Sequence, residues 1–233
     1  MWTLTDILFP PRCAVCDGLL KPSERGVCEK CTPKLVRIKD PRCMKCGKTV
    51  TDREIYCPDC TMHAHAFESG RALFLYNDAM KNSIYRFKYA GRKEYAAFYA
   101  DSMAEEYARW ISTIKADAIV PIPLHKKRLK ERGFNQAELI ARRLSEAVFV
   151  PVCTDLLIRQ VATRKQKELS AKERENNLKK AFKISENDVK LKTVILCDDI
   201  YTTGSTIDAV ATLLKRSGVQ EVYFIALAIG KGF

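Results

Sequence analysis

The sequence predicts an α/β domain with a mostly parallel sheet, preceded by a small cysteine-rich module. Downstream of residue 70, short apolar runs alternate with longer amphipathic segments, an order typical of parallel sheets covered by helices on both faces. Residues 1–65 are instead rich in Cys, Pro, Lys and Arg and have no long apolar periods. A chain of 233 residues is long enough for one full core and one satellite. We therefore expect two units, residues 1–65 and residues 66–233.

The N-terminal module contains two similar halves, each with two Cys-x-x-Cys pairs. The eight cysteines are Cys13, Cys16, Cys28 and Cys31, followed by Cys43, Cys46, Cys57 and Cys60. One Cys-x-x-Cys turn brings two sulfurs to a metal ion, and two such turns complete a tetrahedral zinc site. We predict a double zinc ribbon with two structural Zn²⁺ ions bound by adjacent motifs, while an interleaved ligand arrangement stays open. Disulfides are the alternative, which the lack of a secretory-signal pattern in residues 1–9 disfavours.

The second unit divides into apolar runs and amphipathic segments. Strands are predicted at residues 72–76, 116–121, 193–198 and 222–229. Helices are predicted on both sides of Gly91, at residues 134–148 and at residues 206–216. Residues 159–183 combine many basic side chains with weak apolar periodicity, so we expect a mobile charged loop there. Arg164, Lys165 and Lys167 lie in this loop and are candidates to close over a ligand and exclude water.

Residues 194–206 form the most informative motif of the second unit. An apolar strand leads into Asp198 and Asp199, and then into a small-residue loop that opens a helix: Thr202, Thr203, Gly204, Ser205 and Thr206. A helix N-terminus offers free backbone N–H groups and a positive dipole end, which suit a phosphate group. Carboxylates at the carboxyl end of a parallel strand can accept hydrogen bonds from vicinal sugar hydroxyls. The motif predicts a site for a phosphorylated ribose, the alternative being two aspartates that merely cap a turn.

A dense basic run follows the predicted strand at residues 116–121. Lys126, Lys127 and Arg128 begin this run and can neutralise a pyrophosphate group. Solvated charge on a helix face is the alternative for each of them. The formal net charge of +12 also favours phosphate-rich partners, either small polyphosphates or nucleic acid.

Residues 194–206 closely resemble the phosphoribosyl pyrophosphate signature of type I phosphoribosyltransferases. The cysteine pairs and residues 121–124, 131–136, 163–169 and 176–182 extend a resemblance to the ComF family over nearly the whole chain. This resemblance implies that Asp198 and Asp199 are catalytic residues that bind the ribose hydroxyls, and that the Thr202 to Thr206 loop binds the 5′-phosphate. It also implies Mg²⁺ as a cofactor, and Lys126, Lys127 and Arg128 as the pyrophosphate site. The family is associated with natural competence, the uptake of single-stranded DNA for transformation.

Three functional hypotheses remain at this point. The first is a phosphoribosyltransferase whose acceptor is not evident from the sequence. The second is a non-catalytic module that senses phosphoribosyl pyrophosphate and binds single-stranded DNA through cations interleaved with aromatic residues: Arg86, Lys88, Arg92 and Lys93. The third is an adaptor that docks other uptake proteins through Trp2, Ile7, Leu8 and Phe9.

The partners and location are expectations of the same kind. The resemblance implies contacts with other competence proteins, such as the helicase of the ComF operon. The longest apolar run, residues 222–229, is too short to span a bilayer, so we do not expect an integral membrane protein. We expect the chain in the cytoplasm, with peripheral attachment to the inner membrane face left open. His63 and His65 are expected to be ordinary surface histidines, because each zinc site already has four sulfurs.

Overall fold

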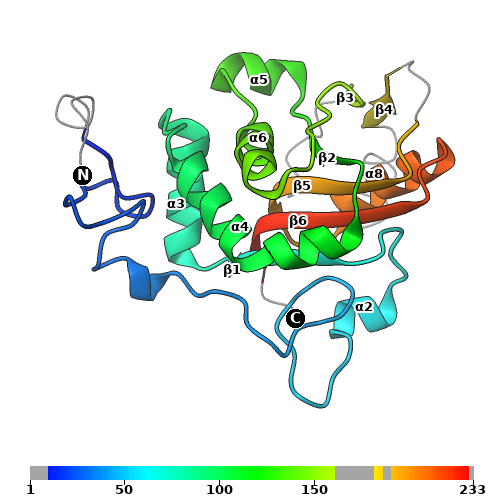
Figure 1. Ribbon diagram of the computed structural model, residues 1–233, viewed down its shortest axis with the longest axis horizontal. Helices are drawn as coiled ribbons and strands as arrows, with labels where there is room; N and C mark the ends of the chain where they lie inside the picture. The colour runs from blue at the N-terminus through cyan, green and yellow to red at the C-terminus, as the bar shows by residue number, and fades with distance from the viewer. Residues whose placement is uncertain (1–9, 161–180, 186–189, 231–233) are drawn as a thin grey trace, which may run out of the picture.

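The second unit is built on a parallel sheet. The computed structural model describes residues 10–160, 181–185 and 190–230. Over these residues four strands pair in the order β1-β6-β5-β2, every pair being parallel (Figure 1). They are β1 (Gly70–Leu75), β2 (Ala118–Pro121), β5 (Thr193–Tyr201) and β6 (Glu221–Ile229). The predicted α/β class with a mostly parallel sheet is therefore confirmed.

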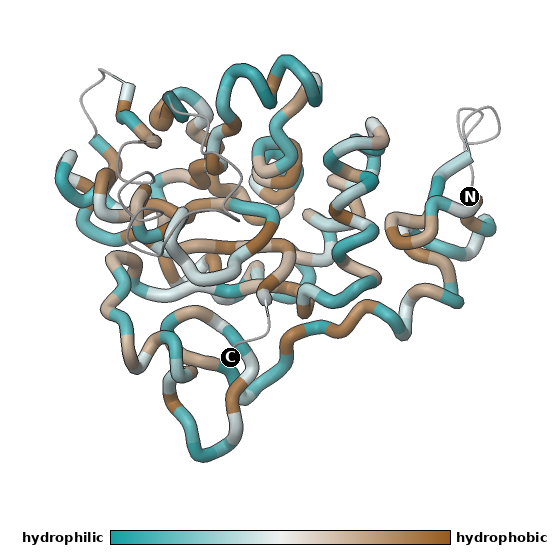
Figure 2. The backbone as a smooth tube through the Cα atoms, turned by 180° about the vertical axis from the view of Figure 1, so that it is seen from behind, coloured by the Kyte–Doolittle hydropathy of each residue, from teal (hydrophilic) through white to brown (hydrophobic). Residues whose placement is uncertain are grey.

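Helices cover both faces of this sheet, because alternate residues of each strand point to opposite sides. The helices are α3 (Asp78–Tyr89), α4 (Tyr95–Ile114), α6 (Gln136–Val148) and α8 (Ser205–Arg216). Ile195 and Cys197 of β5 share a core with α3, α4 and α6, whereas Val194 and Leu196 share the other core with α8. Figure 2 shows the apolar strands at the centre of the domain and the more polar helices around them. Among the described helices, none combines the length and apolar character needed to cross a membrane.

Several element boundaries differ from the sequence-based prediction. Strand β5 continues through Asp198 and Asp199 to Tyr201, because it pairs with β6 as far as Ile229. Residues 126–132, for which the apolar pattern predicts no element, form helix α5 (Lys126–Arg132). The His125 side chain accepts the amide hydrogen of Lys127 and so caps α5.

The predicted charged loop is flanked by a small antiparallel pair of strands. Strands β3 (Leu157–Arg159) and β4 (Phe182–Ile184) pair with each other at the two ends of the segment. Arg164, Lys165 and Lys167 lie outside the described residues, so the prediction for this loop stays a prediction. The same holds for residues 1–9 and the docking segment expected there.

The N-terminal module packs on the domain at two separate places. We call residues 13–31 the first ribbon and residues 43–60 the second ribbon. A short helix accompanies each of them: η1 (Thr32–Lys34) follows the first ribbon, and α2 (Pro58–Met62) begins at the end of the second. Figure 1 shows the first ribbon beside α3 and the second ribbon below β1. Cysteines of the first ribbon belong to the core of α3 and α4, and those of the second to the core of α8.

The segment between the two ribbons covers the outer edge of β1. Ile38 donates its amide hydrogen to the Leu73 carbonyl at 2.9 Å, and Leu75 donates to the Val36 carbonyl at 2.8 Å. These bonds satisfy backbone groups that an open strand edge would leave exposed to other chains. The ribbons and the sheet are therefore joined by backbone pairing as well as by side-chain packing.

Candidate ligand site and zinc centres

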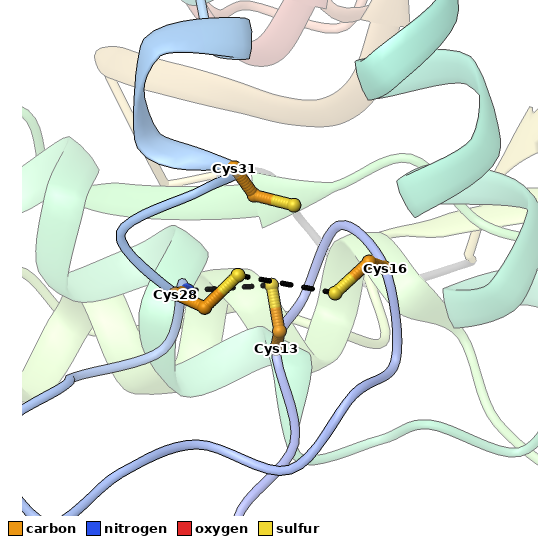
Figure 3. A group of neighbouring side chains, drawn as sticks. All are labelled: Cys13, Cys16, Cys28 and Cys31. Atoms are coloured by element: carbon orange, nitrogen blue, oxygen red, sulfur yellow. Dashed lines mark hydrogen bonds between the residues drawn. The ribbon is translucent and has the colours of Figure 1, made fainter.

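The eight paired cysteines form two separate groups of four. In each group the sulfur atoms all lie within 4.8 Å of one another. Figure 3 shows Cys13, Cys16, Cys28 and Cys31 of the first ribbon with their sulfurs turned toward a common point. The separation is 3.9 Å between the sulfurs of Cys16 and Cys28, and 3.5 Å between those of Cys46 and Cys57. Tetrahedral zinc–thiolate bonds of about 2.3 Å place sulfurs about 3.8 Å apart, so both groups fit zinc.

Adjacent motifs pair within one site, as predicted, and the interleaved alternative is wrong. The two turns have matching backbone geometry: Cys13 donates its amide hydrogen to the Gly18 carbonyl, and Cys43 donates to the Lys48 carbonyl. Four thiolates fill the tetrahedral coordination of each site, so the zinc is structural.

The expectation that His65 lies on the surface is wrong. Its side chain is 4% exposed, and its Nδ1 lies 2.6 Å from a carboxylate oxygen of Asp208. Asp208 is in the first turn of α8, and its other oxygen accepts the amide hydrogen of Ala66 at 2.9 Å. The segment that follows the second ribbon therefore holds the start of α8. His63 is exposed, as expected.

The two candidate catalytic carboxylates lie near the carboxyl end of β5, one of the two inner strands of the sheet. Burial, and then the charge of Asp199, raise the pKa of Asp198 to about 8. Burial would also raise the pKa of Asp199, but the charge of Lys88 and hydrogen bonds to Asp199 hold that pKa below its usual value. The Asp198 carboxylate accepts the amide hydrogen of Asp199 at 2.8 Å. The pair thus combines a carboxyl that keeps its proton with a carboxylate that stays ionised.

Side chains from two helices converge on Asp199. Lys88, near the end of α3, forms an ion pair with its Oδ2 atom. Gln136, the first residue of α6, donates to the same oxygen at 3.0 Å, and Arg132 of α5 donates to the Gln136 side chain. The neighbouring Asn135 caps α6 and binds the Ile122 carbonyl at 3.0 Å, which fixes the segment that leaves β2.

The predicted phosphate loop leads from β5 directly into α8. Gly204 lies at the N-cap position with φ of 83°, a left-handed conformation that favours glycine. An added Cβ at Gly204 would lie 2.5 Å from the Tyr201 hydroxyl. Thr203 and Ser205 share a hydroxyl hydrogen bond of 2.8 Å, while Thr202 and Thr203 are exposed. No side chain among the described residues caps α8, so its first N–H groups are available to an anion.

The predicted pyrophosphate residues begin α5. Lys126 and Lys127 are exposed there, and within the described part of the chain neither has a recorded contact with Asp198 or Asp199. Arg128 lines a cavity of about 220 Å³ together with Lys88, Tyr89, Gly91, Glu131 and Arg132. Three cations and one carboxylate thus surround a small space beside the Lys88–Asp199 ion pair.

The candidate DNA-binding cations have partners within the chain. Arg86 donates to the Val15 carbonyl, and Arg92 pairs with Asp17 at 2.7 Å, so both contact the first ribbon. Lys93 is exposed and its Nζ lies 5.3 Å from the Phe134 ring centroid. The fourth cation, Lys88, forms the ion pair with Asp199.

Sequence reasoning missed two contributors to this site. The sequence pattern predicts Lys88 on a surface patch, because its helix is amphipathic and nothing local in the sequence links it to Asp199. Arg159 ends β3, and burial and then the charge of Arg128 lower its pKa, while Asp198 opposes that shift. For Arg159, the only local sequence feature that could have indicated a role at the site is a basic residue at the end of a short apolar strand.

Comparison with known proteins agrees with this arrangement. A family model described as the double zinc ribbon domain matches residues 4–61, and one described as the phosphoribosyl transferase domain matches residues 102–232. Competence protein F from Haemophilus influenzae is 31% identical and covers 94% of this chain and 97% of its own length. Competence protein ComFC from Bacillus subtilis is 31% identical, covering 86% of this chain and 82% of its own length.

A further relative and a solved structure complete the comparison. The DNA utilization protein YhgH from Escherichia coli is 30% identical and covers 93% of this chain and 96% of its own length. The crystal structure of a purine phosphoribosyltransferase from Pyrococcus horikoshii matches 57% of this chain and 74% of that chain, with 20% identity and a TM-score of 0.37.

Proposed function

Because the chain belongs to the ComF family, with its double zinc ribbon and phosphoribosyltransferase domain, we propose that it binds phosphoribosyl pyrophosphate with Mg²⁺ and transfers the phosphoribosyl group. One observation carries the proposal. A carboxylate pair on β5, with Asp199 buried and Asp198 half-buried, leads within a few residues to the free N-terminus of α8, and basic side chains line the adjacent cavity. This order matches the parts of the ligand: ribose hydroxyls, 5′-phosphate and pyrophosphate.

The chain's own groups would divide the work of binding. Asp199, held ionised, accepts hydrogen bonds from the ribose hydroxyls, while Asp198 can donate one through its retained proton. The Thr202 to Thr206 loop holds the 5′-phosphate with N–H groups and hydroxyls. In this proposal the negative charge of the departing pyrophosphate is neutralised by three basic side chains, Lys126, Lys127 and Arg128.

The proposed reaction is a substitution at C1 of the ribose. The bond from C1 to the pyrophosphate oxygen breaks, the pair of electrons leaves with pyrophosphate, and a nucleophilic acceptor forms the new bond to C1. The site stabilises the charge that develops on the leaving group, which is the kind of electrostatic assistance that accelerates such steps. Mg²⁺ bound to the ligand oxygens would neutralise part of that charge.

The names of the relatives suggest the process in which the chain acts. Two are competence proteins and one is a DNA utilization protein, so we propose a role in handling DNA that is taken up during transformation. Other competence proteins, including the helicase of the ComF operon, are then its expected partners.

A second candidate is a module that senses phosphoribosyl pyrophosphate and binds single-stranded DNA without turnover. It is favoured by an exposed aromatic pair on α3: Tyr85 and Tyr89 are 62% and 65% exposed, with ring centroids 5.0 Å apart. Arg132 lies over the Tyr89 ring at 5.2 Å. Such rings can stack on bases while Lys93 contacts the backbone phosphates. Since Arg86 and Arg92 contact the first ribbon, they would join this surface only by exchanging partners.

The test is a calorimetric titration of the zinc-loaded protein with phosphoribosyl pyrophosphate and Mg²⁺. The double variant Asp198→Asn/Asp199→Asn keeps the size of both side chains and is measured in parallel for binding, zinc content and thermal unfolding. We expect binding to the wild type and a loss of at least about tenfold in the folded variant, since hydrogen bonds to charged groups are removed.

Pyrophosphate release separates the two candidates. Release that depends on an added acceptor supports the transferase, whereas tight binding without release supports the sensor. Equal binding of the ligand to the wild type and the double variant, or none to either, would overturn the proposed site.

A further inference from the structure

The ion pair between Lys88 and Asp199 occupies the carboxylate that the proposed function needs. Both side chains are largely buried, at 17% and 8% exposed. Lys88 comes from α3, and Asp199 from β5 in the centre of the sheet. Among the described residues, the ion pair and the Gln136 hydrogen bond both engage the Oδ2 atom of Asp199.

A ribose hydroxyl cannot replace the charge that Lys88 provides. A hydroxyl donates one neutral hydrogen bond, whereas Lys88 compensates a buried negative charge. Ribose binding to Asp199 therefore requires Lys88 either to share the carboxylate or to find another anion. A buried ammonium left without a partner would make ligand binding costly.

The adjacent cavity supplies a place for that anion. Lys88 itself lines it, with Arg128 and Arg132 as the other cations. Its volume of about 220 Å³ is below the range of about 300–1,000 Å³ typical of drug-sized ligands, so it suits a small anionic group. A lysine ammonium has three donors on a flexible stem and can turn from a carboxylate to a phosphate oxygen.

The helix that carries Lys88 is held in place, so the change would involve the side chain alone. Ser83 and Arg86 of α3 donate to the carbonyls of Ala14 and Val15 in the first ribbon. Phe87, next to Lys88, is fully buried against Phe134 and Tyr99. A fixed backbone with one movable cation can exchange partners without rearranging the fold.

We propose that Lys88 pairs with Asp199 in the ligand-free chain and with the pyrophosphate of bound phosphoribosyl pyrophosphate, and that this exchange selects ligands carrying pyrophosphate. The inference rests on the proposed function and names Lys88 as a further substrate-binding residue. Ribose 5-phosphate has no pyrophosphate group, so it competes with Lys88 for Asp199 without supplying a new anion for the Lys88 ammonium. Phosphoribosyl pyrophosphate provides the new partner along with the ribose.

The test is calorimetry with two ligands, phosphoribosyl pyrophosphate and ribose 5-phosphate, each with Mg²⁺. Lys88→Met removes the cation, Lys88→Arg keeps a charge, and Lys81→Met on the exposed side of the same helix is the matched control. In Lys88→Met we expect the affinity for phosphoribosyl pyrophosphate to fall at least about tenfold, because a charge-assisted hydrogen bond is lost. The affinity for ribose 5-phosphate should stay unchanged or rise. Lys88→Arg should recover most of the difference, and Lys81→Met should match the wild type.

Each other outcome has a defined meaning. If Lys88→Met lowers the affinity for both ligands equally, Lys88 only orients Asp199 and the inference is wrong. Unchanged affinity for both ligands would also overturn it. If the wild type binds neither ligand, the proposed function itself fails. Zinc content and thermal unfolding show whether Lys88→Met is folded. If it is misfolded, Lys88→Gln takes its place in the calorimetry with the same expected outcomes, because glutamine can keep a hydrogen bond to Asp199 without the charge.

Discussion

Two neighbouring carboxyl groups of β5 have opposite protonation behaviour. Asp198 is half-buried beside a charged carboxylate, and desolvation and then that charge raise its pKa to about 8, while Lys88 stabilises the ionised form of Asp199. A pair of this kind can both donate to and accept from a diol, which two ionised carboxylates cannot do. The difference arises because the Lys88 ion pair and the Gln136 hydrogen bond both engage Asp199.

The raised pKa of Asp198 predicts how stability depends on pH. Because the folded state binds this proton more tightly than the unfolded state, Asp198 makes the free energy of unfolding fall as pH rises from about 4 to about 8. Asp198→Asn mimics the protonated form and removes that dependence. At pH 8 to 9 we expect Asp198→Asn to be more stable than the wild type by at least about 1 kcal/mol.

Denaturant unfolding of both proteins across this pH range measures the contribution of Asp198 together with its coupling to Asp199, since groups that do not interact with Asp198 contribute equally to both proteins. Parallel curves for the two proteins between pH 5 and pH 8 would show that Asp198 is ionised in the folded chain.

At the scale of elements, the junction of β5 and α8 depends on a glycine. Gly204 has φ of 83° and lies against the Tyr201 ring, so Gly204→Ala adds both backbone strain and a clash. We expect Gly204→Ala to weaken binding of phosphoribosyl pyrophosphate by about tenfold, because the first N–H groups of α8 shift.

Gly218→Ala is the matched control for this change. Gly218 has φ of 102° beyond the other end of α8, with open space around it. It should lose stability through backbone strain alone in thermal unfolding and keep full affinity in calorimetry. A Gly204→Ala protein with unchanged affinity would mean that the phosphate does not bind at this helix end.

Local sequence patterns predict most of these elements, and they fail where pairing or burial is set by distant residues. The apolar runs of β1, β2 and β6 and the helices around Gly91 are recognisable, because one period of side chains faces the core. The last residues of β5 are missed, because the polar Asp198 and Asp199 interrupt the run while backbone pairing continues. The backbone bonds of residues 36–38 to β1 carry no local signal at all.

The site shows the same division between local and distant information. The cysteine groups and the glycine turn that opens α8 are recognisable in the sequence, because the residues of each lie close together in the chain. The ion pair of Lys88 with Asp199 and the contact of His65 with Asp208 join segments that are far apart in the chain, so only the folded arrangement shows them.

At the scale of the whole molecule, the two zinc ribbons support the two sides of the candidate site. The first ribbon contacts α3, the helix of Lys88, through the Ala14 and Val15 carbonyls, which accept hydrogen bonds from Ser83 and Arg86. Its Asp17 binds Arg92, which follows α3, at 2.7 Å and the hydroxyl of Tyr95, which begins α4, at 2.6 Å. The second ribbon leads into His65, which holds the first turn of α8. Zinc binding is thus expected to stabilise the phosphoribosyltransferase domain as well as the ribbons themselves.

Single ligand substitutions test this coupling. Cys16→Ser and Cys60→Ser should each lower the zinc content from two ions to one per chain, measured by elemental analysis. Because the ribbons share cores with the domain, each variant should lower the midpoint of thermal unfolding by at least about 5 °C, in a single cooperative transition. Cys153→Ser is the control, since Cys153 belongs to neither group of four and its hydrogen bond to Asp155 can be kept by serine. A variant that loses one zinc ion while the domain unfolds at the wild-type temperature would show that the ribbons fold independently, and would remove the structural reason for joining them to this domain.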